Sequence, residues 1–266
     1  MQPDTIQRVE GGRRTRGDVR TTQPLVSVII VVRNGKNDIE NALASVSAQS
    51  KELCELLVID GVSTDGTLDV LEKHSDTIDY WMSEPDNGIY DAMNKAVKLA
   101  RGKYVYFLGS DDLLTVDLKV LASVLTDPNA VYYGNVVLPS GEIPSWNGPY
   151  DVWRLAKGTM CQQAIFYPIC AFQNASFCTD YKITADYAFN LCCFGDKRLH
   201  FQYIPYVIAI YSDKGISSRA NDPVFWRDWF RLIRRHLPAH VYVIHRSKIH
   251  FLSLMQRCRK RLKISA

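Results

Sequence analysis

Two adjacent carboxylates, Asp111 and Asp112, follow an apolar run in the stretch FLGSDDLL, residues 107–114. Both cannot be buried without partners, because an unpaired charge that is taken out of water is strongly destabilising. One of them could cap a helix, which residues 113–125 predict, and the other then needs a cation. Paired carboxylates suit Mg²⁺ or Mn²⁺ bound together with phosphate oxygens. The stretch therefore predicts a metal-assisted site.

The elements that lead to these carboxylates alternate between strands and helices. Continuous apolar runs predict buried strands, and apolar residues at helical spacing predict helices between them. The predicted strands are 25–32, 54–61, 78–85 and 103–112, and the predicted helices are 38–49, 63–74 and 87–102. Repeated units of this kind indicate an α/β fold, a mainly parallel sheet with helices on both faces.

Polar residues stand at the ends of three predicted strands. They are Arg33 and Asn34, then Asp60 and Gly61, then residues 110–112. In parallel sheets the carboxyl ends of the strands share one edge, and ligands bind beyond that edge. Asp60 alone could merely cap the next helix, but three polar strand ends together predict a ligand site.

The composition is that of a globular protein. A chain of 266 residues, 47% hydrophobic and 11% aromatic, can bury a core in one large domain or two small ones. Its seven cysteines include no CxxC pair, which indicates reduced thiols in a cytosol. No stretch reaches the roughly 18–20 apolar residues of a transmembrane helix. Residues 1–24 contain five arginines and no apolar signal region, so we expect a flexible arm there.

The net charge of +4 is unevenly distributed along the chain. From Arg219 to the C-terminus, twelve Lys and Arg residues oppose only Asp222 and Asp228. Residues 225–238 and 248–263 place apolar side chains among arginines at spacings typical of amphipathic helices. We therefore expect residues 220–266 to form a basic amphipathic helical tail that binds an anionic membrane surface. No recognised nucleic-acid module is present.

Four stretches occur in a fixed order: SVIIVVRNGKNDIENALASVSAQ, LLVIDGVSTDGTLDVL, SEPDNGIYDAMNKAVKLARGKYVYFLGSDD and ITADYAFNL. Together they closely resemble the GT-A type family 2 glycosyltransferases of bacterial O-antigen, exopolysaccharide and colanic-acid pathways. The resemblance covers residues 25–219 and implies a Rossmann-like GT-A domain, with a nucleotide-binding half at 25–113 and an acceptor half at 114–219. It implies inverting sugar transfer from a nucleotide diphosphate to a glycan or lipid-linked acceptor, assisted by Mn²⁺ or Mg²⁺.

The resemblance also assigns roles to residues of the nucleotide-binding half. Asp60 is similar to the carboxylate that accepts the uracil N3 hydrogen, which favours a UDP-sugar donor, and Asp112 resembles the metal ligand. Other implied contacts with the donor are Val32, Arg33, Asn34, Ser63, Asp86, Gly88, Asn94 and, near the ribose, Asp111. The chain departs from the family pattern at Val62, where many relatives have a second glycine, and at Gly109, where they have asparagine.

The acceptor half must supply a base, because in-line displacement requires a group that takes the proton of the attacking hydroxyl. Asp186 in ITADYAFNL matches the position of that base, with a helix N-cap as its alternative role. Weaker resemblances suggest acceptor contacts and a lid over the donor. The expected acceptor contacts are Gln162, Gln163 and Tyr181, with Trp146 and Trp153 as further stacking candidates, and the expected lid residues are Lys214, Gly215 and Arg219.

The resemblance places such an enzyme in the cytoplasm, at the inner face of the cytoplasmic membrane, with a lipid-diphosphate-linked acceptor. Two other functions remain open on the sequence. A sugar nucleotidyltransferase shares the parallel sheet and metal carboxylates, although RNGKND (33–38) lacks a glycine-rich triphosphate loop. A glycan-binding domain without turnover would keep the fold alone. The oligomeric state and the identity of the sugar do not follow from the sequence.

Overall fold

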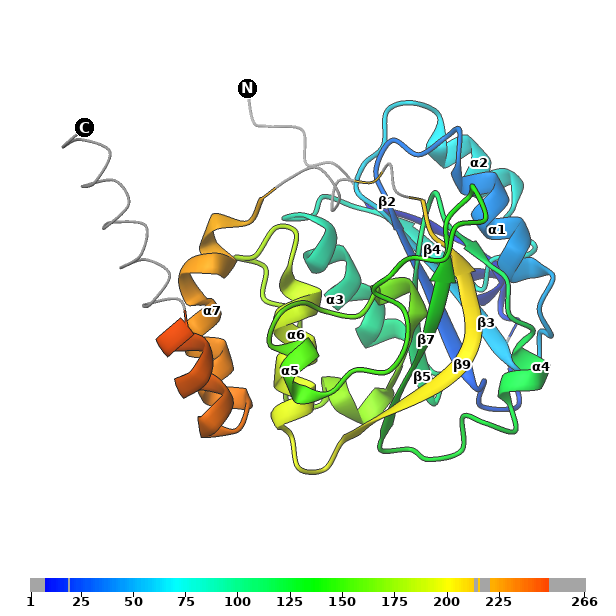
Figure 1. The fold of residues 1–266 in the computed structure, drawn as a ribbon. Helices are drawn as coiled ribbons and strands as arrows, with labels where there is room; N and C mark the ends of the chain where they lie inside the picture. Colours follow the sequence, from blue (N-terminus) through cyan, green and yellow to red (C-terminus); the bar gives the residue numbers. More distant parts are fainter. Residues whose placement is uncertain (1–7, 19, 213–214, 216–220, 249–266) are drawn as a thin grey trace, which may run out of the picture.

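The computed structural model describes residues 8–18, 20–212, 215 and 221–248 (Figure 1). Within these residues, strands form one nine-stranded sheet in the order β1-β4-β3-β2-β5-β8-β7-β9-β6. β4, β3, β2 and β5 are parallel to one another, and so are β7 and β9. β8 lies antiparallel between β5 and β7. The sheet thus runs without a break through both halves that the sequence suggested.

The strands are β1 Val9–Gly11, β2 Val26–Val32, β3 Cys54–Asp60, β4 Tyr80–Ser83, β5 Tyr104–Gly109, β6 Leu113–Leu114, β7 Ala130–Val137, β8 Ile165–Pro168 and β9 His200–Ile210. The α-helices are α1 Ile39–Ser47, α2 Thr67–Lys73, α3 Ile89–Leu99, α4 Leu118–Leu121, α5 Val152–Leu155, α6 Ala185–Gly195 and α7 Pro223–His236, and residues 239–248 are also helical. The 3-10 turns are η1 Arg13–Arg16, η2 Gln162–Ala164 and η3 Ile169–Phe172.

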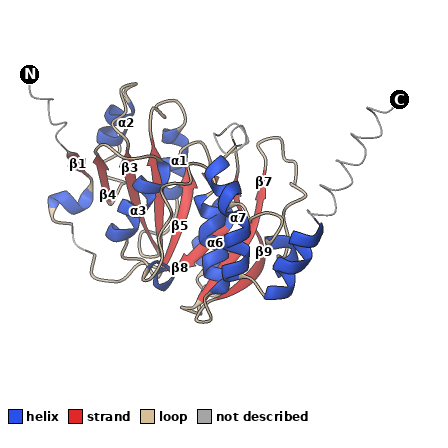
Figure 2. Ribbon diagram, turned by 90° about the vertical axis from the view of Figure 1, so that its left-hand side faces the viewer, coloured by secondary structure: helices blue, strands red, loops and turns tan. Residues whose placement is uncertain are grey.

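Helices cover both faces of the sheet, as predicted, because the central strands carry apolar side chains on both sides. Val28 and Ile30 of β2 belong to the core beneath α1, α2 and α4. Ile29 belongs to the opposite core, with α3, α6 and α7. Figure 2 shows α3, α6 and α7 in front of the sheet. The continuous apolar runs of the sequence therefore predicted the central strands correctly.

The prediction of a long helix at 113–125 is wrong. Leu113 and Leu114 form β6, which pairs antiparallel with Ala209 and Ile210 of β9. The helix α4 begins only at Leu118, and the side chain of Asp117 caps it by accepting from the N–H of Lys119 at 2.8 Å. Neither Asp111 nor Asp112 therefore caps a helix.

The prediction of a flexible arm is wrong for the described residues before 25. β1 pairs with β4, and the arginines of the following turn reach into the domain. Arg14 forms an ion pair with Glu55, which is fully buried in β3, while Arg13 and Arg20 bind the buried Asp79 at 2.7 and 2.9 Å. The arm thus neutralises two buried carboxylates.

The tail predicted from residue 220 begins as part of the folded domain. The helix α7 is amphipathic, but Phe225, Trp229 and Ile233 on its apolar side are buried in the core beside α6. Each such side chain stabilises the fold by about 1.5–3 kcal/mol, so this face is not available to lipid. The second predicted amphipathic segment lies outside the described residues except for Lys248. No helix in the described part of the chain combines the length and apolar character needed to cross a membrane.

Candidate active site

The three polar strand ends meet at one edge of the sheet. Val32 at the end of β2 is in register with Asp60 of β3, and Asp60 is in register with Ser83 of β4. On the other side of β2, Val31 is in register with Gly109 of β5. The turns at 33–36, 61–66 and 110–112 therefore begin side by side, as the parallel order predicted.

The first two of these turns are locked to each other by hydrogen bonds. The N–H of Asn34 donates to the Ser63 hydroxyl at 2.7 Å, and the Asn34 carbonyl oxygen Oδ1 accepts from the N–H of Thr64 at 2.9 Å. The N–H of Lys36 donates to Asp65 at 3.0 Å. Asn34 adopts a left-handed conformation, φ 56°, which asparagine tolerates better than most residues. The turn that carries Arg33 and Asn34 is thus held in one shape.

Asp60 is fully buried, and its carboxylate is nearly satisfied by neighbours. It accepts from the N–H of Ser63 at 2.9 Å, from the Ser63 hydroxyl and from the Ser83 hydroxyl at 2.6 Å. A carboxylate has about four acceptor positions, so these three hydrogen bonds fill most of them and hold the Asp60 side chain in place.

Asp86 lies against the turn after Asp60. Its Oδ2 atom is 2.5 Å from the place that a Cβ on Gly61 would take, so residue 61 must be glycine for this carboxylate to fit. Its Oδ1 atom accepts from the N–H of Gly88 at 2.8 Å. Gly88 has φ 113° and ψ 173°, a backbone conformation that is essentially restricted to glycine. The segment 86–88 is therefore shaped to present Asp86 at this edge.

Val62 occupies a left-handed conformation, with φ 58°, that a β-branched residue rarely adopts. We predict that Val62→Gly stabilises the protein by about 1 kcal/mol, because relief of the backbone strain outweighs the entropy cost of glycine. Urea denaturation of both proteins measures the difference. Val62→Ala is the control, since it keeps a Cβ at the same φ and should gain less. A Val62→Gly protein that is less stable than the wild type would show that the backbone at Val62 is not strained.

Asp112 is almost completely buried, with 1% of the residue exposed, and Oδ1 accepts from the N–H of Ser212 at 2.6 Å. Burial raises the pKa of Asp112 to about 7; the Ser212 N–H opposes this shift, and the charge of Asp111 adds to it. The carboxylate folds back over Gly109, where any Cβ would collide with its Oδ2 atom. Glycine at position 109 is thus a requirement of this Asp112 conformation.

The carboxylates at 111 and 112 fit a divalent cation that shares its coordination with a substrate. Among the residues that the structure describes, neither carboxylate forms an ion pair with Lys, Arg or His. No cluster of three or more His, Cys, Asp or Glu in this part of the chain could enclose a metal ion. Mg²⁺ commonly uses one or two carboxylates, with phosphate oxygens and waters as further ligands. The donor set present here matches that mode.

Asp186 lies in the first turn of α6, whose N-cap is Thr184, so the N-cap alternative does not hold. The Tyr90 hydroxyl lies 3.0 Å from Asp186 Oδ1. Burial raises the pKa of Asp186 to about 6, while the N–H of Tyr187 and the Tyr90 hydroxyl lower it. Asp186 as a residue remains partly exposed. A carboxylate with this pKa is largely ionised at neutral pH and can accept a proton.

Cys161 lies near both carboxylates. The negative charges of both Asp112 and Asp186 act on its thiol, whose pKa is raised mainly by burial. The thiol donates to Gln163 Oε1 at 3.2 Å, and the Gln163 side chain also donates to Asp112. The candidate metal ligand and the candidate base therefore both lie near Cys161.

Three predicted contacts are corrected by the structure. The Asn94 amide is used by the backbone of Phe177, to which it donates at 2.8 Å and from which it accepts at 3.0 Å, so it does not face a nucleotide. Gln162 points into the core at Met93, and the Tyr181 hydroxyl donates to Asp228 at 3.2 Å, so neither side chain is presented to an acceptor. Gln163 lies at Asp112 instead.

The roles predicted for the remaining residues stay predictions. Trp153 lines a surface groove of about 490 Å³ together with Tyr150, Arg154 and Lys157. Trp146 is 42% exposed. Lys214 and Arg219 of the predicted lid lie outside the described residues, and Gly215 is described and partly buried, which does not test a hinge there.

The sequence indicated the segment that contains Tyr90, but it did not indicate Ser212 or Asp222 as parts of this site. Asp222 is 3% exposed and accepts from the N–H groups of Ile183 and Thr184, just before Asp186. The pair Asp222-Pro223 does carry a helix-start signal, an aspartate before a proline at the first helical position. Ser212 gave no such signal, and the contact of Tyr90 with Asp186 was not foreseen, because the partners of both residues lie about 100 residues away in the chain.

Two known glycosyltransferases are similar in sequence to this chain. A PGL/p-HBAD biosynthesis glycosyltransferase of Mycobacterium tuberculosis is 34% identical over 213 residues, which is 76% of this chain and 82% of the relative. The putative teichuronic acid biosynthesis glycosyltransferase TuaG of Bacillus subtilis is 43% identical over 93 residues, 34% of this chain and 37% of that protein.

Two solved structures share the fold. S. aureus TarS 1-349 in complex with UDP-GlcNAc matches 82% of this chain and 69% of its own with a TM-score of 0.66 at 20% identity. The mannosyltransferase PcManGT of Pyrobaculum calidifontis, in complex with GDP-Man and Mn²⁺, matches 81% of this chain and 64% of its own with a TM-score of 0.59 at 21% identity. The fold is therefore GT-A.

The sequence model described as glycosyl transferase family 2 matches residues 27–186, which include all three strand-end turns and Asp186. With this match and the relative that aligns over most of both chains, the chain belongs to glycosyltransferase family 2.

Proposed function

We propose that this protein is an inverting glycosyltransferase that moves a sugar from a UDP-sugar to a hydroxyl of a glycan or lipid-linked oligosaccharide, in the biosynthesis of a bacterial surface polysaccharide. The names of the relatives support glycan biosynthesis, since they refer to PGL/p-HBAD and teichuronic acid. The neighbour in complex with UDP-GlcNAc supports a uridine nucleotide.

The observation that carries this proposal is that Asp112 and Asp186, which come from different halves of the domain, both lie near Cys161. Displacement with inversion needs stabilisation of the leaving group on one side of the sugar and a base on the other. Asp112 follows β5, beside the turns at 33–36 and 61–66, which we call the nucleotide turns. Asp186 lies on α6 in the acceptor half. One carboxylate from each half of the domain is suited to this requirement, Asp112 as a ligand for the cation and Asp186 as the base.

In the proposed reaction the nucleotide-binding half, 25–113, holds the donor. Asp60 accepts from the base, the turn at Val32, Arg33 and Asn34 lies along it, and Asp111 lies near the ribose. Asp112 would hold Mn²⁺ or Mg²⁺, and the bound cation would neutralise negative charge on the diphosphate leaving group. Asp186 takes the acceptor hydroxyl proton while the oxygen bonds to the anomeric carbon and the bond to the diphosphate breaks.

The test is an assay in which each candidate function gives a different product. The protein is incubated with Mn²⁺, a series of UDP-sugars and lipid-linked or free oligosaccharides, and the release of UDP is measured. We expect UDP release that depends on the acceptor and is lost with EDTA. Pyrophosphate release from UTP and a sugar 1-phosphate would instead identify a nucleotidyltransferase, and binding of glycan with neither product would identify a domain without turnover.

We also propose that the enzyme works at the inner face of the cytoplasmic membrane, bound through the outer side of its C-terminal helices. Three large apolar side chains are about half exposed there, Trp226, Val243 and Ile244, and arginines accompany them on α7. We expect co-sedimentation with vesicles that contain phosphatidylglycerol, and weaker sedimentation of an Arg234→Glu/Arg235→Glu variant. Equal recovery with anionic and zwitterionic vesicles would contradict binding by charge.

A further inference from the structure

The segment that leads to Asp186 is held by a helix of the nucleotide-binding half. At its start, Asn94 of α3 exchanges two hydrogen bonds with the backbone of Phe177. At its end, Tyr90 of the same helix donates to the carbonyl oxygen of Ile183 at 2.6 Å. The motif GIYDAMNK (88–95) therefore directs two of its side chains toward the base segment, whose sequence lies more than 80 residues further along the chain.

The opposite side of this segment is held by α7. Asp222 accepts from the N–H of Ile183 at 2.9 Å and from the N–H of Thr184 at 3.3 Å. It also accepts from the N–H of Phe225 in the first turn of α7. The backbone at Ile183 is thus fixed on both sides, its carbonyl by Tyr90 and its N–H by Asp222.

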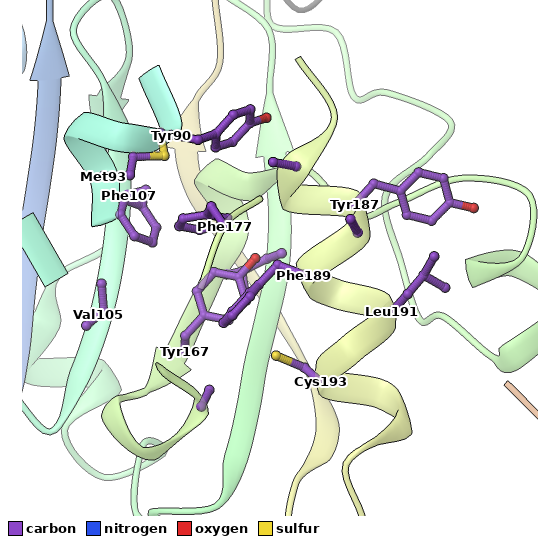
Figure 3. Close-up of a cluster of buried hydrophobic side chains, with 14 of the residues drawn as sticks. Tyr90, Met93, Val105, Phe107, Tyr167, Phe177, Tyr187, Phe189, Leu191 and Cys193 are labelled. Carbon is purple, nitrogen blue, oxygen red and sulfur yellow. The ribbon is translucent and has the colours of Figure 1, made fainter. Parts of the chain in front are cut away.

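The Tyr90 hydroxyl is placed to bind Asp186 as well. It lies 3.0 Å from Asp186 Oδ1 and 2.6 Å from the Ile183 carbonyl, and its single hydrogen can be donated to either oxygen. The ring is buried, with 6% of the residue exposed, and packs on Phe177 with ring centroids 5.4 Å apart. Figure 3 shows the hydroxyl pointing toward the chain that enters α6. Packing thus fixes the donor while Asp186 remains partly exposed.

We propose that Tyr90 is a positioning residue for sugar transfer, whose hydroxyl holds the Asp186 carboxylate and its segment against the helix that begins beside the nucleotide turns. This inference rests on the proposed role of Asp186 as the base. The segment 86–90 then connects both reactants, because Asp86 lies at Gly61 in the nucleotide turn and Tyr90 lies at the base.

The groups that face Asp186 come from three elements. Tyr90 faces it from α3, Tyr167 from β8, and Cys161 from the turn before η2. Of these three side chains only Tyr90 donates to its carboxylate, because the Tyr167 hydroxyl donates to Asn190 at 2.8 Å, and the N–H groups of Asp186 and Tyr187 are the other donors. No Lys or Arg contributes to the Asp186 pKa among the described residues. The Tyr90 hydrogen bond favours the ionised carboxylate, so its loss raises the Asp186 pKa further.

The experiment compares Tyr90→Phe with Tyr167→Phe. Both variants remove one buried hydroxyl and keep the ring, but only the first removes a donor from Asp186. We expect the rise of kcat/KM with pH, which follows ionisation of the base near pH 6, to move upward by about one pH unit in Tyr90→Phe. The profile of Tyr167→Phe should stay within a few tenths of a unit of the wild type, and the KM for the donor should stay the same in both.

A second readout does not depend on activity. The carboxyl ¹³C signal of Asp186 is titrated by NMR in the wild type and both variants, and it should show the same upward shift in Tyr90→Phe alone. Equal shifts in both variants, or none, overturn the proposal. If the Asp186 pKa shifts in Tyr90→Phe alone but the wild type transfers no sugar, the proposed function is refuted while the Tyr90–Asp186 hydrogen bond stands. If Tyr90→Phe does not fold, the Tyr90 hydroxyl proton of the wild type is followed instead, and a signal that stays constant while Asp186 titrates overturns the proposal.

Discussion

Replacing Asp186 with asparagine should lower the rate of sugar transfer by about 10²–10⁴-fold, the usual contribution of a positioned general base. Asparagine has nearly the same shape and still accepts from Tyr90, but it cannot take the proton of the acceptor hydroxyl. Donor affinity should be unchanged, because Asp186 lies on α6 and not in the nucleotide turns. Turnover at saturating donor and acceptor, with the UDP-sugar Kd from calorimetry, measures both effects.

Two further substitutions make this result specific. Asp180→Asn changes a carboxylate six residues earlier and should leave turnover intact. Asp112→Asn should instead weaken donor binding in the presence of Mn²⁺, because the carboxylate that it neutralises is the one proposed to hold the cation. Normal turnover in Asp186→Asn would show that another group takes the proton.

The sequence predicted the part of the site that depends on local pattern. Strands β2, β3 and β5 are buried on both faces, so they read as continuous apolar runs, and the residue that follows each run lies at the shared edge. Asp60, Asp111 and Asp112 were placed correctly at that edge for this reason. Gly109 and Val62 also stood out as departures, and the structure gives each a physical consequence.

The remaining features depend on partners that no local pattern shows. Asn94 is polar on an exposed-looking helix face, yet its amide completes the backbone of Phe177, 83 residues later. Leu113 and Leu114 precede residues with the apolar spacing of a helix, but their pairing with β9 makes them a strand. The N-terminal arginines resemble a solvated arm until Glu55 and Asp79 are placed beside them. In each case a long-range hydrogen bond or ion pair outweighs the local preference.

The ion pair between Arg14 and Glu55 leads to the largest expected change in stability. Arg14→Met should lower the free energy of unfolding by about 3–5 kcal/mol, because it leaves the charge of Glu55 buried without its cation. The Glu55 side chain has no exposed surface, and its other oxygen already accepts from the Ser27 hydroxyl and from the N–H of Arg101. Urea denaturation monitored by circular dichroism measures the loss.

Two comparisons separate this burial from the general effect of removing an arginine. Arg16→Met removes a neighbouring arginine whose partner, Asp76, is 83% exposed, and such surface pairs contribute little. Arg14→Met/Glu55→Gln removes the buried charge together with its partner and keeps an acceptor for Ser27 and Arg101, so it should recover most of the loss. If Arg14→Met were as stable as Arg16→Met, the ion pair between Arg14 and Glu55 would contribute no more than a surface contact.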